Sequence, residues 1–220
     1  MLQGGSGVIG NRTVYSISHM RRGSKRIADK CMKLLDGVPL VSHTLGKLNK
    51  VGYIDKVCVS TSDDEYAQFV YDCHGAYVVN RPERLSGDTV HHIEVINHAV
   101  RNLDLAGNDY IVFVDITKPF TKMETIKKVI VTAHKHNADT VFTSKKIRNK
   151  TIGVFADAMN WGAVRLYRVS SLLNYEGDEY GRGFNHYDLP IIEDYETDLD
   201  FPHDWIMTEA LIGAGYETSR

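Results

Sequence analysis

Residues 19–26, HMRRGSKR, follow the first apolar stretch of the chain and are strongly basic. Cations beside a Gly-Ser pair in a tight loop suit a polyphosphate, because backbone N–H groups can cradle oxygens while Arg and Lys neutralise their charge. The order differs from the P-loop pattern G-x-x-x-x-G-K-S/T, since Ser24 precedes Lys25. The alternative is a basic turn exposed to solvent. Position directly after a strand-like segment favours the phosphate-binding hypothesis.

A second candidate segment is acidic and contains Asp198, Asp200 and Asp204. Two aspartates at i and i+2 in an extended segment can converge on Mg²⁺, which takes a couple of carboxylates plus substrate phosphate. Asp204 fits a simpler alternative, because acids are favoured at the start of a helix and one is expected from Pro202. Asp115 adds a third carboxylate at the end of an apolar strand. Together with the basic loop, these acids indicate metal-assisted phosphoryl or nucleotidyl transfer.

The glycine motif G-x-G-x-x-G at residues 5–10 precedes the strand-like segment RTVYSIS. A dinucleotide-binding loop must instead follow a strand and open a helix, so that the pyrophosphate meets the helix N-terminus. We therefore interpret residues 1–12 as a flexible N-terminal segment. A histidine metal site is also disfavoured, since His91-His92 and His134-x-His136 lack the spacing that places two side chains on one helix face.

Segments typical of strands alternate with segments of helical periodicity as far as residue 145. This alternation predicts βαβ units and a mostly parallel sheet. Ligands bind beyond the carboxyl ends of such strands, so the basic loop, residues 80–89 and Asp115 are expected at one edge. The rhythm breaks over residues 145–190, which we interpret as an excursion from the sheet. The expected strands are residues 12–18, 54–61, 76–79, 109–116, 138–144 and 161–168, and the expected helices are 40–48, 62–75, 90–103, 123–136 and 200–215.

Composition sets broad limits on function. At 220 residues, with 43% hydrophobic and 25% charged residues, the chain suits one globular domain over residues 13–220. The net charge of −2 gives no reason to expect nucleic acid as a partner. Three cysteines are too few for a disulfide framework. No apolar run approaches the length of a membrane span and no signal peptide is visible, so we expect a cytoplasmic protein without a membrane partner.

The basic loop, read as M-R-R-G-S-K-R-I-A-D-K-C, resembles the A-R-x-G-S-K-x-I-P-x-K-N loop of the CMP-sugar synthetases, the acylneuraminate cytidylyltransferase family. The segment GVPLVSHTL is similar to the G-x-P-L-x-x-x-T helix of that family, and residues 80–89 to its R-P-x-x-L loop. The segment DLDFPHD resembles the D-I-D-T-P-E-D stretch that binds metal. The resemblance spans most of residues 13–212.

The resemblance implies a three-layer α/β/α Rossmann-like nucleotidyltransferase fold with a small dimerisation arm at residues 145–190, and hence a homodimer. It implies transfer from CTP to an acidic sugar, with release of pyrophosphate, in the presence of Mg²⁺. The implied metal ligands are Asp198 and Asp200, and the implied catalytic residues are Arg21, Lys25 and Asp200. The nucleotide-binding set expected from the resemblance and from the sheet edge is Arg21, Arg22, Gly23, Ser24, Lys25, Arg26, Ser86, Gly87, Asp88 and Asp115.

The chain departs from the family mainly where the sugar is placed. The L-Q-P-T-S-P-L-R segment appears here as residues 114–121, VDITKPFT, and the N-G-A-I-Y signature as WGAVR at residues 161–165. Because of these differences, the sequence does not identify the acceptor molecule. A nucleotidyltransferase with another base or acceptor, and a nucleotide-binding interaction domain with weakened catalysis, are the alternatives.

Overall fold

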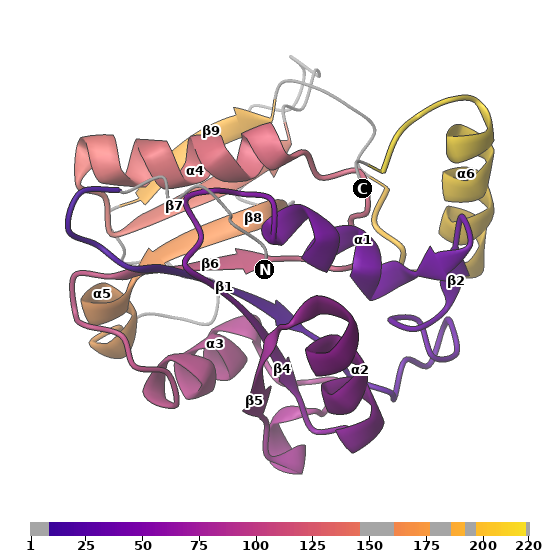
Figure 1. Cartoon of the computed structure of the whole chain (residues 1–220), viewed down its shortest axis with the longest axis horizontal. Coiled ribbons are helices and arrows are strands. Elements are labelled where there is room, and N and C mark those ends of the chain that lie inside the picture. Colours follow the sequence, from indigo (N-terminus) through magenta and orange to yellow (C-terminus); the bar gives the residue numbers. More distant parts are fainter. Residues whose placement is uncertain (1–8, 146–160, 177–185, 192–196, 219–220) are drawn as a thin grey trace.

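A seven-stranded sheet lies at the centre of the chain, with its strands in the order β5-β4-β1-β6-β8-β7-β9 (Figure 1). The computed structural model describes residues 9–145, 161–176, 186–191 and 197–218. Four of the neighbouring strand pairs are parallel, and β8 runs antiparallel to both β6 and β7. The mostly parallel α/β sheet predicted from the sequence is therefore confirmed. Its strands are β1 Val14–His19, β4 Lys56–Thr61, β5 Tyr77–Asn80, β6 Tyr110–Val114, β7 Thr140–Lys145, β8 Trp161–Arg168 and β9 His186–Ile191.

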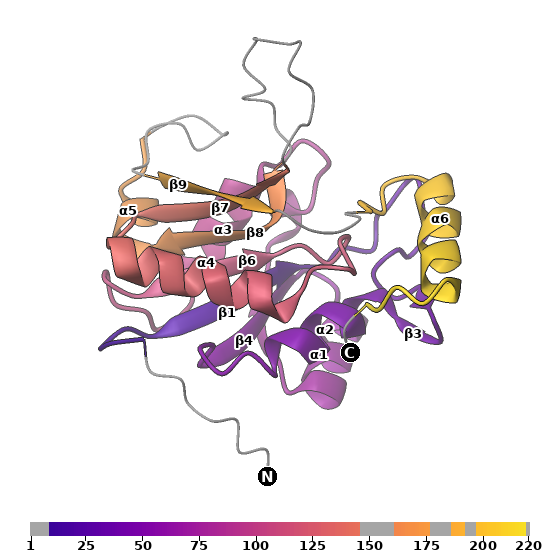
Figure 2. The same cartoon turned by 90° about the horizontal axis from the view of Figure 1, so that it is seen from above.

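Helices cover both faces of the sheet and make a three-layer arrangement (Figure 2). On one face, α1, α2 and α4 pack in a large apolar cluster, and on the other α3 and α5 pack in a second cluster. The short ribbon of β2 Leu34–Leu35 and β3 Val38–Pro39 lies beside α6 (Figure 1). The helices are α1 Leu40–Leu48, α2 Asp64–His74, α3 His92–Arg101, α4 Met123–His136, α5 Val169–Leu173 and α6 Pro202–Gly213.

Local sequence signals account for where several of these helices begin and end. The side chain of Asp63 accepts a hydrogen bond from the N–H of Tyr66 at 3.0 Å and caps the first turn of α2. Gly75 ends α2 with a φ of 61°, a left-handed conformation that favours glycine. At α6, Asp204 accepts a hydrogen bond from the N–H of Phe201 at 2.7 Å. Asp204 is therefore a capping residue, as its position before an apolar helix predicted.

The chain after residue 145 differs from the sequence prediction. Residues 145–190 were expected to leave the sheet, yet β8 and β9 from this segment are strands of the main sheet. Strand β8 pairs directly with β6, and Val112 lies opposite Leu166. Residues 146–160 and 177–185, including most of the SKKIRNK segment, lie outside the described residues. Strand β9 and helix α5 have no counterpart among the elements predicted from the sequence.

Residues 9–12, assigned from the sequence to a flexible segment, are packed against the body of the protein. Ile9 is buried, and the guanidinium of Arg12 lies 4.8 Å from the centroid of the Tyr110 ring. Gly10 precedes strand β1 and is followed by no helix, so the inverted order of the glycine motif is confirmed. Gly5 and Gly7 lie outside the described residues. Among the helices described, none combines the length and apolar character that crossing a membrane requires.

Two glycines in neighbouring helices provide a test of these backbone assignments. Gly75→Ala should lower the free energy of unfolding by about 1 kcal/mol, because alanine is strained in the left-handed region. Gly46→Ala, in the last turn of α1, should raise it by up to about 1 kcal/mol through helix propensity. An added Cβ at Gly46 meets no atom within 4 Å. Urea denaturation measures both, and equal effects of the two substitutions would contradict the assigned C-cap.

Candidate functional site

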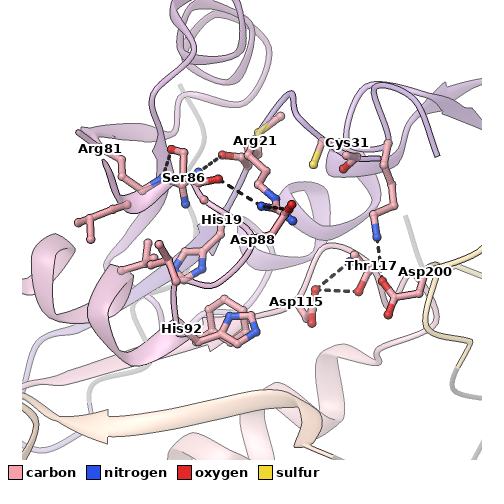
Figure 3. A pocket seen from close by; sticks show the side chains of 18 of the residues that line it. His19, Arg21, Cys31, Arg81, Ser86, Asp88, His92, Asp115, Thr117 and Asp200 are labelled. Carbon is pink, nitrogen blue, oxygen red and sulfur yellow. Dashed lines mark hydrogen bonds and ion pairs between the residues drawn. The ribbon is translucent and has the colours of Figure 1, made fainter. Parts of the chain in front are cut away.

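A cavity of about 340 Å³ opens beyond the carboxyl ends of β1 and β6 (Figure 3). Parallel pairing of β1 with β4 and β6 brings the loops that follow these strands to the same edge. The volume falls within the range of small-molecule sites. One wall is formed by Met20, Arg21 and Ser24, a second by Arg81, Ser86, Gly87 and Asp88, and a third by Asp115, Thr117, Asp198 and Asp200.

Two of the predicted catalytic residues, Arg21 on the cationic wall and Lys25 of the same loop, both pair with Asp88. Nη1 of Arg21 lies 2.8 Å from Oδ1 of Asp88 and donates a hydrogen bond to the carbonyl of Ser86 at 3.2 Å. Nζ of Lys25 lies 2.5 Å from Oδ2 of the same carboxylate. The hydrogen bond from Lys25, then its charge and that of Arg21, lower the pKa of Asp88. Asp88 therefore links the basic loop to the loop that follows β5.

Buried Arg81 fixes the relative position of these two loops. Its Nη2 donates to the carbonyl of Met20 at 2.6 Å, and its Nε donates to Oγ of Ser86 at 3.1 Å. Oγ of Ser86 is also 2.9 Å from Oγ of Ser62, at the end of β4. A guanidinium with several donors in a rigid fork can join backbone and side-chain acceptors in this way. Arg81 thus holds the segment that precedes Arg21 against Ser86.

The basic loop divides its side chains between the cavity and other contacts. Arg22 turns away, since its Nε lies 2.6 Å from Oδ2 of Asp63 and its Nη2 pairs with Glu65 at the start of α2. Arg26 stacks over the ring of Phe201, 4.4 Å from its centroid, near the start of α6. Of the six loop residues predicted to bind nucleotide, Arg21 and Ser24 line the cavity, whereas Arg22, Gly23, Lys25 and Arg26 do not.

On the acidic wall, Thr117 joins two of the predicted carboxylates. Its N–H and its Oγ1 lie 3.0 and 2.9 Å from Oδ1 of Asp115 (Figure 3). The same Oγ1 lies 2.7 Å from Oδ1 of Asp198. The N–H of Leu199 donates to the carbonyl of Thr117 at 3.0 Å. The loop after β6 and the segment before α6, 81 residues apart at the Thr117–Asp198 contact, are thereby held together.

Positively charged side chains lie beside Asp198 and Asp200, the two aspartates before α6. Nζ of Lys30 lies 3.2 Å from Oδ1 of Asp200 and donates to the carbonyl of Leu199 at 2.7 Å. Nη1 of Arg26 lies 3.5 Å from Oδ2 of Asp200, and Nζ of Lys118 lies 3.8 Å from Oδ2 of Asp198. These contacts offset the repulsion between neighbouring carboxylates.

The pKa values of the two Thr117-linked acids are shifted in opposite directions. Burial, and then the charge of Asp115, raise the pKa of Asp198. At Asp115 burial acts in the same direction, but attraction to His92, a hydrogen bond from Thr117 and the charge of Lys118 outweigh it and lower the pKa. Asp115 is therefore held as a carboxylate at neutral pH.

Two histidines and a phenylalanine form the floor of the cavity. The rings of His19 and His92 stack with centroids 5.8 Å apart, and Phe113 lies 4.8 Å from His19 and 5.3 Å from His92. Burial, and then the charge of Arg165, lower the pKa of His92 to about 4. Burial likewise holds the pKa of His19 well below its ordinary value. Both imidazoles are therefore neutral at pH 7 and offer hydrogen bonds and stacking instead of charge.

The donor set of the acidic wall fits a hard divalent cation. Two carboxylates, from Asp198 and Asp200, and the hydroxyl of Thr117 are oxygen ligands of the kind that Mg²⁺ prefers. The described residues contain no cluster of three or more His, Cys, Asp or Glu side chains arranged to hold a metal. Mg²⁺ usually takes one or two carboxylates and completes its shell with water and substrate phosphate. Such a site depends on the nucleotide as well as on the protein.

Several residues of the cavity were not selected from the sequence. His19, Arg81, His92, Phe113 and Thr117 all line it. Arg81 carries a sequence signal, because it belongs to the R-P-x-x-L segment, and His19 is the first residue of the basic segment 19–26. His92 carries a signal only as a candidate ligand of a histidine metal site. Thr117 belongs to the 114–121 segment that resembles the sugar-placing segment of the family, whereas Phe113 carries no signal beyond its position near the end of a buried strand.

The fold and the site together define an α/β Rossmann-like protein with a composite cavity of cationic and acidic walls. The chain belongs to the cytidylyltransferase family, whose family model matches residues 16–158. The family predicted from the basic loop and the acidic segment is thus confirmed.

The curated relatives are CMP-sugar synthetases. The chain is 33% identical over 116 residues to 3-deoxy-manno-octulosonate cytidylyltransferase 2 of Hydrogenovibrio crunogenus, covering 53% of this chain and 45% of the relative. It is 28% identical over 144 residues to an N-acylneuraminate cytidylyltransferase of Streptococcus agalactiae, covering 64% and 34%. It is 27% identical over 120 residues to CMP-N,N'-diacetyllegionaminic acid synthase of Legionella pneumophila, covering 53% and 51%. The matched part thus spans between about a third and a half of these relatives.

Solved structures resemble the chain over almost its whole length. A CMP:2-keto-3-deoxy-manno-octonic acid synthetase complexed with CTP aligns with a TM-score of 0.71 at 13% identity, covering 92% of this chain and 99% of that one. A cytidylyltransferase from Leptospira borgpetersenii aligns with a TM-score of 0.68 at 15% identity, covering 96% and 90%. At these identities the likeness establishes the fold.

Proposed function

We propose that this protein transfers the cytidylyl group of CTP to an acidic sugar, with Mg²⁺, to give a CMP-sugar and pyrophosphate. The observation that carries the proposal is the placement of Arg21 and Ser24 on one wall of the cavity and Asp198 and Asp200 on another. A nucleoside triphosphate between these walls meets cations on one side and carboxylates suited to a divalent ion on the other. Family membership supports cytidine as the base.

In this proposal the cationic wall binds and orients the triphosphate. The side chain of Arg21 is 38% exposed and directs its guanidinium toward the cavity, where it pairs with Asp88 (Figure 3). Phosphate oxygens can replace that carboxylate, because a guanidinium forms paired hydrogen bonds with either anion. Arg21 and Ser24 supply side-chain donors, and Lys25, paired with Asp88 at the rim, adds positive charge. Fixed donors of this kind stabilise the charge that develops on the oxygens during transfer.

On the acidic wall, Asp198 and Asp200 would hold Mg²⁺, with Lys30, Arg26 and Lys118 balancing the carboxylates. When bound, the ion would neutralise phosphate oxygens and favour departure of pyrophosphate. Thr117 and Leu199 keep the segment that carries both aspartates in place.

The proposed reaction replaces the phosphoanhydride bond between the α- and β-phosphates of CTP with a phosphoester bond to the sugar. An oxygen of the sugar's anomeric hydroxyl forms a bond to the α-phosphorus, and the bond from the α-phosphorus to the bridging oxygen of the β-phosphate breaks. Pyrophosphate leaves with that bonding pair, and the hydroxyl proton passes to solvent. The protein contributes mainly positioning and charge stabilisation.

An acidic sugar is the proposed acceptor because the curated relatives are named for such acceptors, 3-deoxy-manno-octulosonate, N-acylneuraminate and diacetyllegionaminate. The acceptor would lie over the neutral floor of His92 and Phe113, next to Asp115. Asp115 stands where the family pattern has Gln, so the preferred acceptor is expected to differ in the group that meets this side chain.

We extend the proposal to a homodimer formed through the segment within residues 145–190 that resembles the family's dimerisation arm. Light scattering at micromolar concentration is expected to give twice the monomer mass of 24.8 kDa. A monomer mass would contradict the dimer and leave the site assignment intact.

Calorimetric titration of CTP, UTP, ATP and GTP, with and without Mg²⁺, tests the proposed function. CTP is expected to bind most tightly, and Mg²⁺ to strengthen its binding. Asp200→Asn should remove most of that metal-dependent gain and leave metal-free binding within about twofold, because one metal carboxylate is lost. An unchanged metal dependence would contradict the metal site, and failure of every nucleotide to bind would overturn the proposed function.

Adjacent arginines offer a matched test of the cationic wall. Arg21→Ala should lower the rate of pyrophosphate release by roughly a hundredfold, through loss of a charge contact in the transition state. Arg22→Ala removes the same charge from the side chain that pairs with Asp63 and Glu65 instead. It should change the rate by less than about threefold, as expected for an exposed ion pair. Similar losses in both variants would contradict the assigned orientations.

A further inference from the structure

Lys47 is a fully buried lysine in the last turn of α1. Its side chain is 1% exposed, and its neighbours on the helix, Leu45 and Leu48, belong to the larger core cluster. No carboxylate of the described residues forms an ion pair with it at 4 Å or less. Lysines are almost never fully buried without a partner charge. Burying Lys47 therefore costs free energy of folding, which indicates that its side chain has a specific role.

The amine of Lys47 contacts the back of the loop between β6 and α4. Nζ donates hydrogen bonds to the carbonyl of Pro119 at 2.6 Å and to that of Thr121 at 2.9 Å. Burial lowers the pKa of Lys47 to about 7. A neutral amine still has two N–H groups, so both carbonyls remain paired in either protonation state. Without this donor, two buried carbonyls would lack a side-chain partner.

The same loop carries the contacts that hold the acidic segment. The N–H and Oγ1 of Thr121 donate to the carbonyl of Lys118, at 3.1 and 2.8 Å, so fixing Thr121 also fixes Lys118. Thr117 lies two residues before Pro119 in this loop. Its Oγ1 lies 2.7 Å from Oδ1 of Asp198, and its carbonyl accepts a hydrogen bond from the N–H of Leu199 at 3.0 Å. Hydrogen bonds at both ends of this short loop, joined by its backbone, thus connect α1 to the segment before α6.

We infer that Lys47 is a positioning residue for the candidate metal site, acting through the 115–121 loop to hold Thr117 against Asp198 and Leu199. The inference rests on the proposed function, because it assumes that Asp198 and Asp200 bind a divalent cation. Lys47 itself lies outside the cavity lining and touches none of the proposed ligands. Its effect is therefore on metal affinity, with little effect on metal-free binding of CTP.

Lys47→Met tests the inference, because methionine approximates the length of lysine but has no donor. The readout is the affinity of the protein–CTP complex for Mn²⁺, followed by the loss of the free Mn²⁺ electron paramagnetic resonance signal. The affinity is expected to fall about tenfold, at the lower end of the range for outer-shell partners of metal ligands. CTP affinity without metal is expected to stay within about twofold.

A structural control separates positioning from a general loss of stability. Leu48→Ala weakens the packing of the same helix in the core cluster and leaves the two hydrogen bonds from Lys47 to the loop in place. It should lower the midpoint of thermal unfolding and leave Mn²⁺ affinity unchanged. Equal losses of Mn²⁺ affinity in Leu48→Ala and Lys47→Met would overturn the inference, as would wild-type affinity in Lys47→Met.

A double-mutant cycle tests the route of the effect. Thr117→Val removes the hydroxyl that contacts Asp198. If Lys47 acts through Thr117, Lys47→Met should then lower the logarithm of the Mn²⁺ affinity by less than half as much in the Thr117→Val background as in the wild type. Fully additive losses would overturn the route through Thr117. If Lys47→Met does not fold, Lys47→Gln replaces it as the test variant. Gln keeps an amide NH₂ group as a donor, so the loss of Mn²⁺ affinity is expected to be smaller. Wild-type Mn²⁺ affinity in Lys47→Gln would overturn the inference.

Wild-type behaviour distinguishes this inference from the proposed function. If the wild-type protein with CTP binds no Mn²⁺, the proposed function fails and the inference fails with it. If the wild type binds Mn²⁺ and Lys47→Met binds it equally well, the inference alone fails.

Discussion

Parallel pairing of β1 with its two neighbours is the constraint on which the site depends. β1 lies between β4 and β6, with Ser16 opposite both Val57 and Val112. Because the three strands run in one direction, the basic loop after β1, Ser62 after β4 and Asp115 after β6 emerge at the same edge. Each of these strands is buried on both faces, so a shift in register would disrupt two apolar clusters at once.

Charge at this edge is balanced before any ligand binds. Asp88 pairs with Arg21 and Lys25, and Lys30 and Arg26 pair with Asp200. Ion pairs of this exposure contribute little to stability, so exchanging Asp88 for phosphate oxygens costs little. The arrangement suits a site that must accept a highly charged nucleotide and then release charged products.

The acidic wall depends on contacts between segments far apart in sequence. Thr117 lies between Asp115 and Asp198, and the backbone of Leu199 is bonded to the same residue. The loop that presents Thr117 has Lys47 on its other side. Support from a buried, regular helix is a common way to hold functional groups that themselves lie on loops.

The sequence by itself determined the α/β alternation, the bounds of α4, the capping role of Asp204 and the basic loop, because these follow from local periodicity and local backbone chemistry. Only the tertiary structure decided that Arg21 lines the cavity while Arg22 does not, since two adjacent side chains on a loop are oriented by distant partners such as Asp63 and Asp88. The tertiary structure likewise decided the place of β9 in the sheet and the contacts of Thr117 and Lys47. Their partners are brought close by strand pairing and helix packing, and the spacing of residues along the chain carries no record of those contacts.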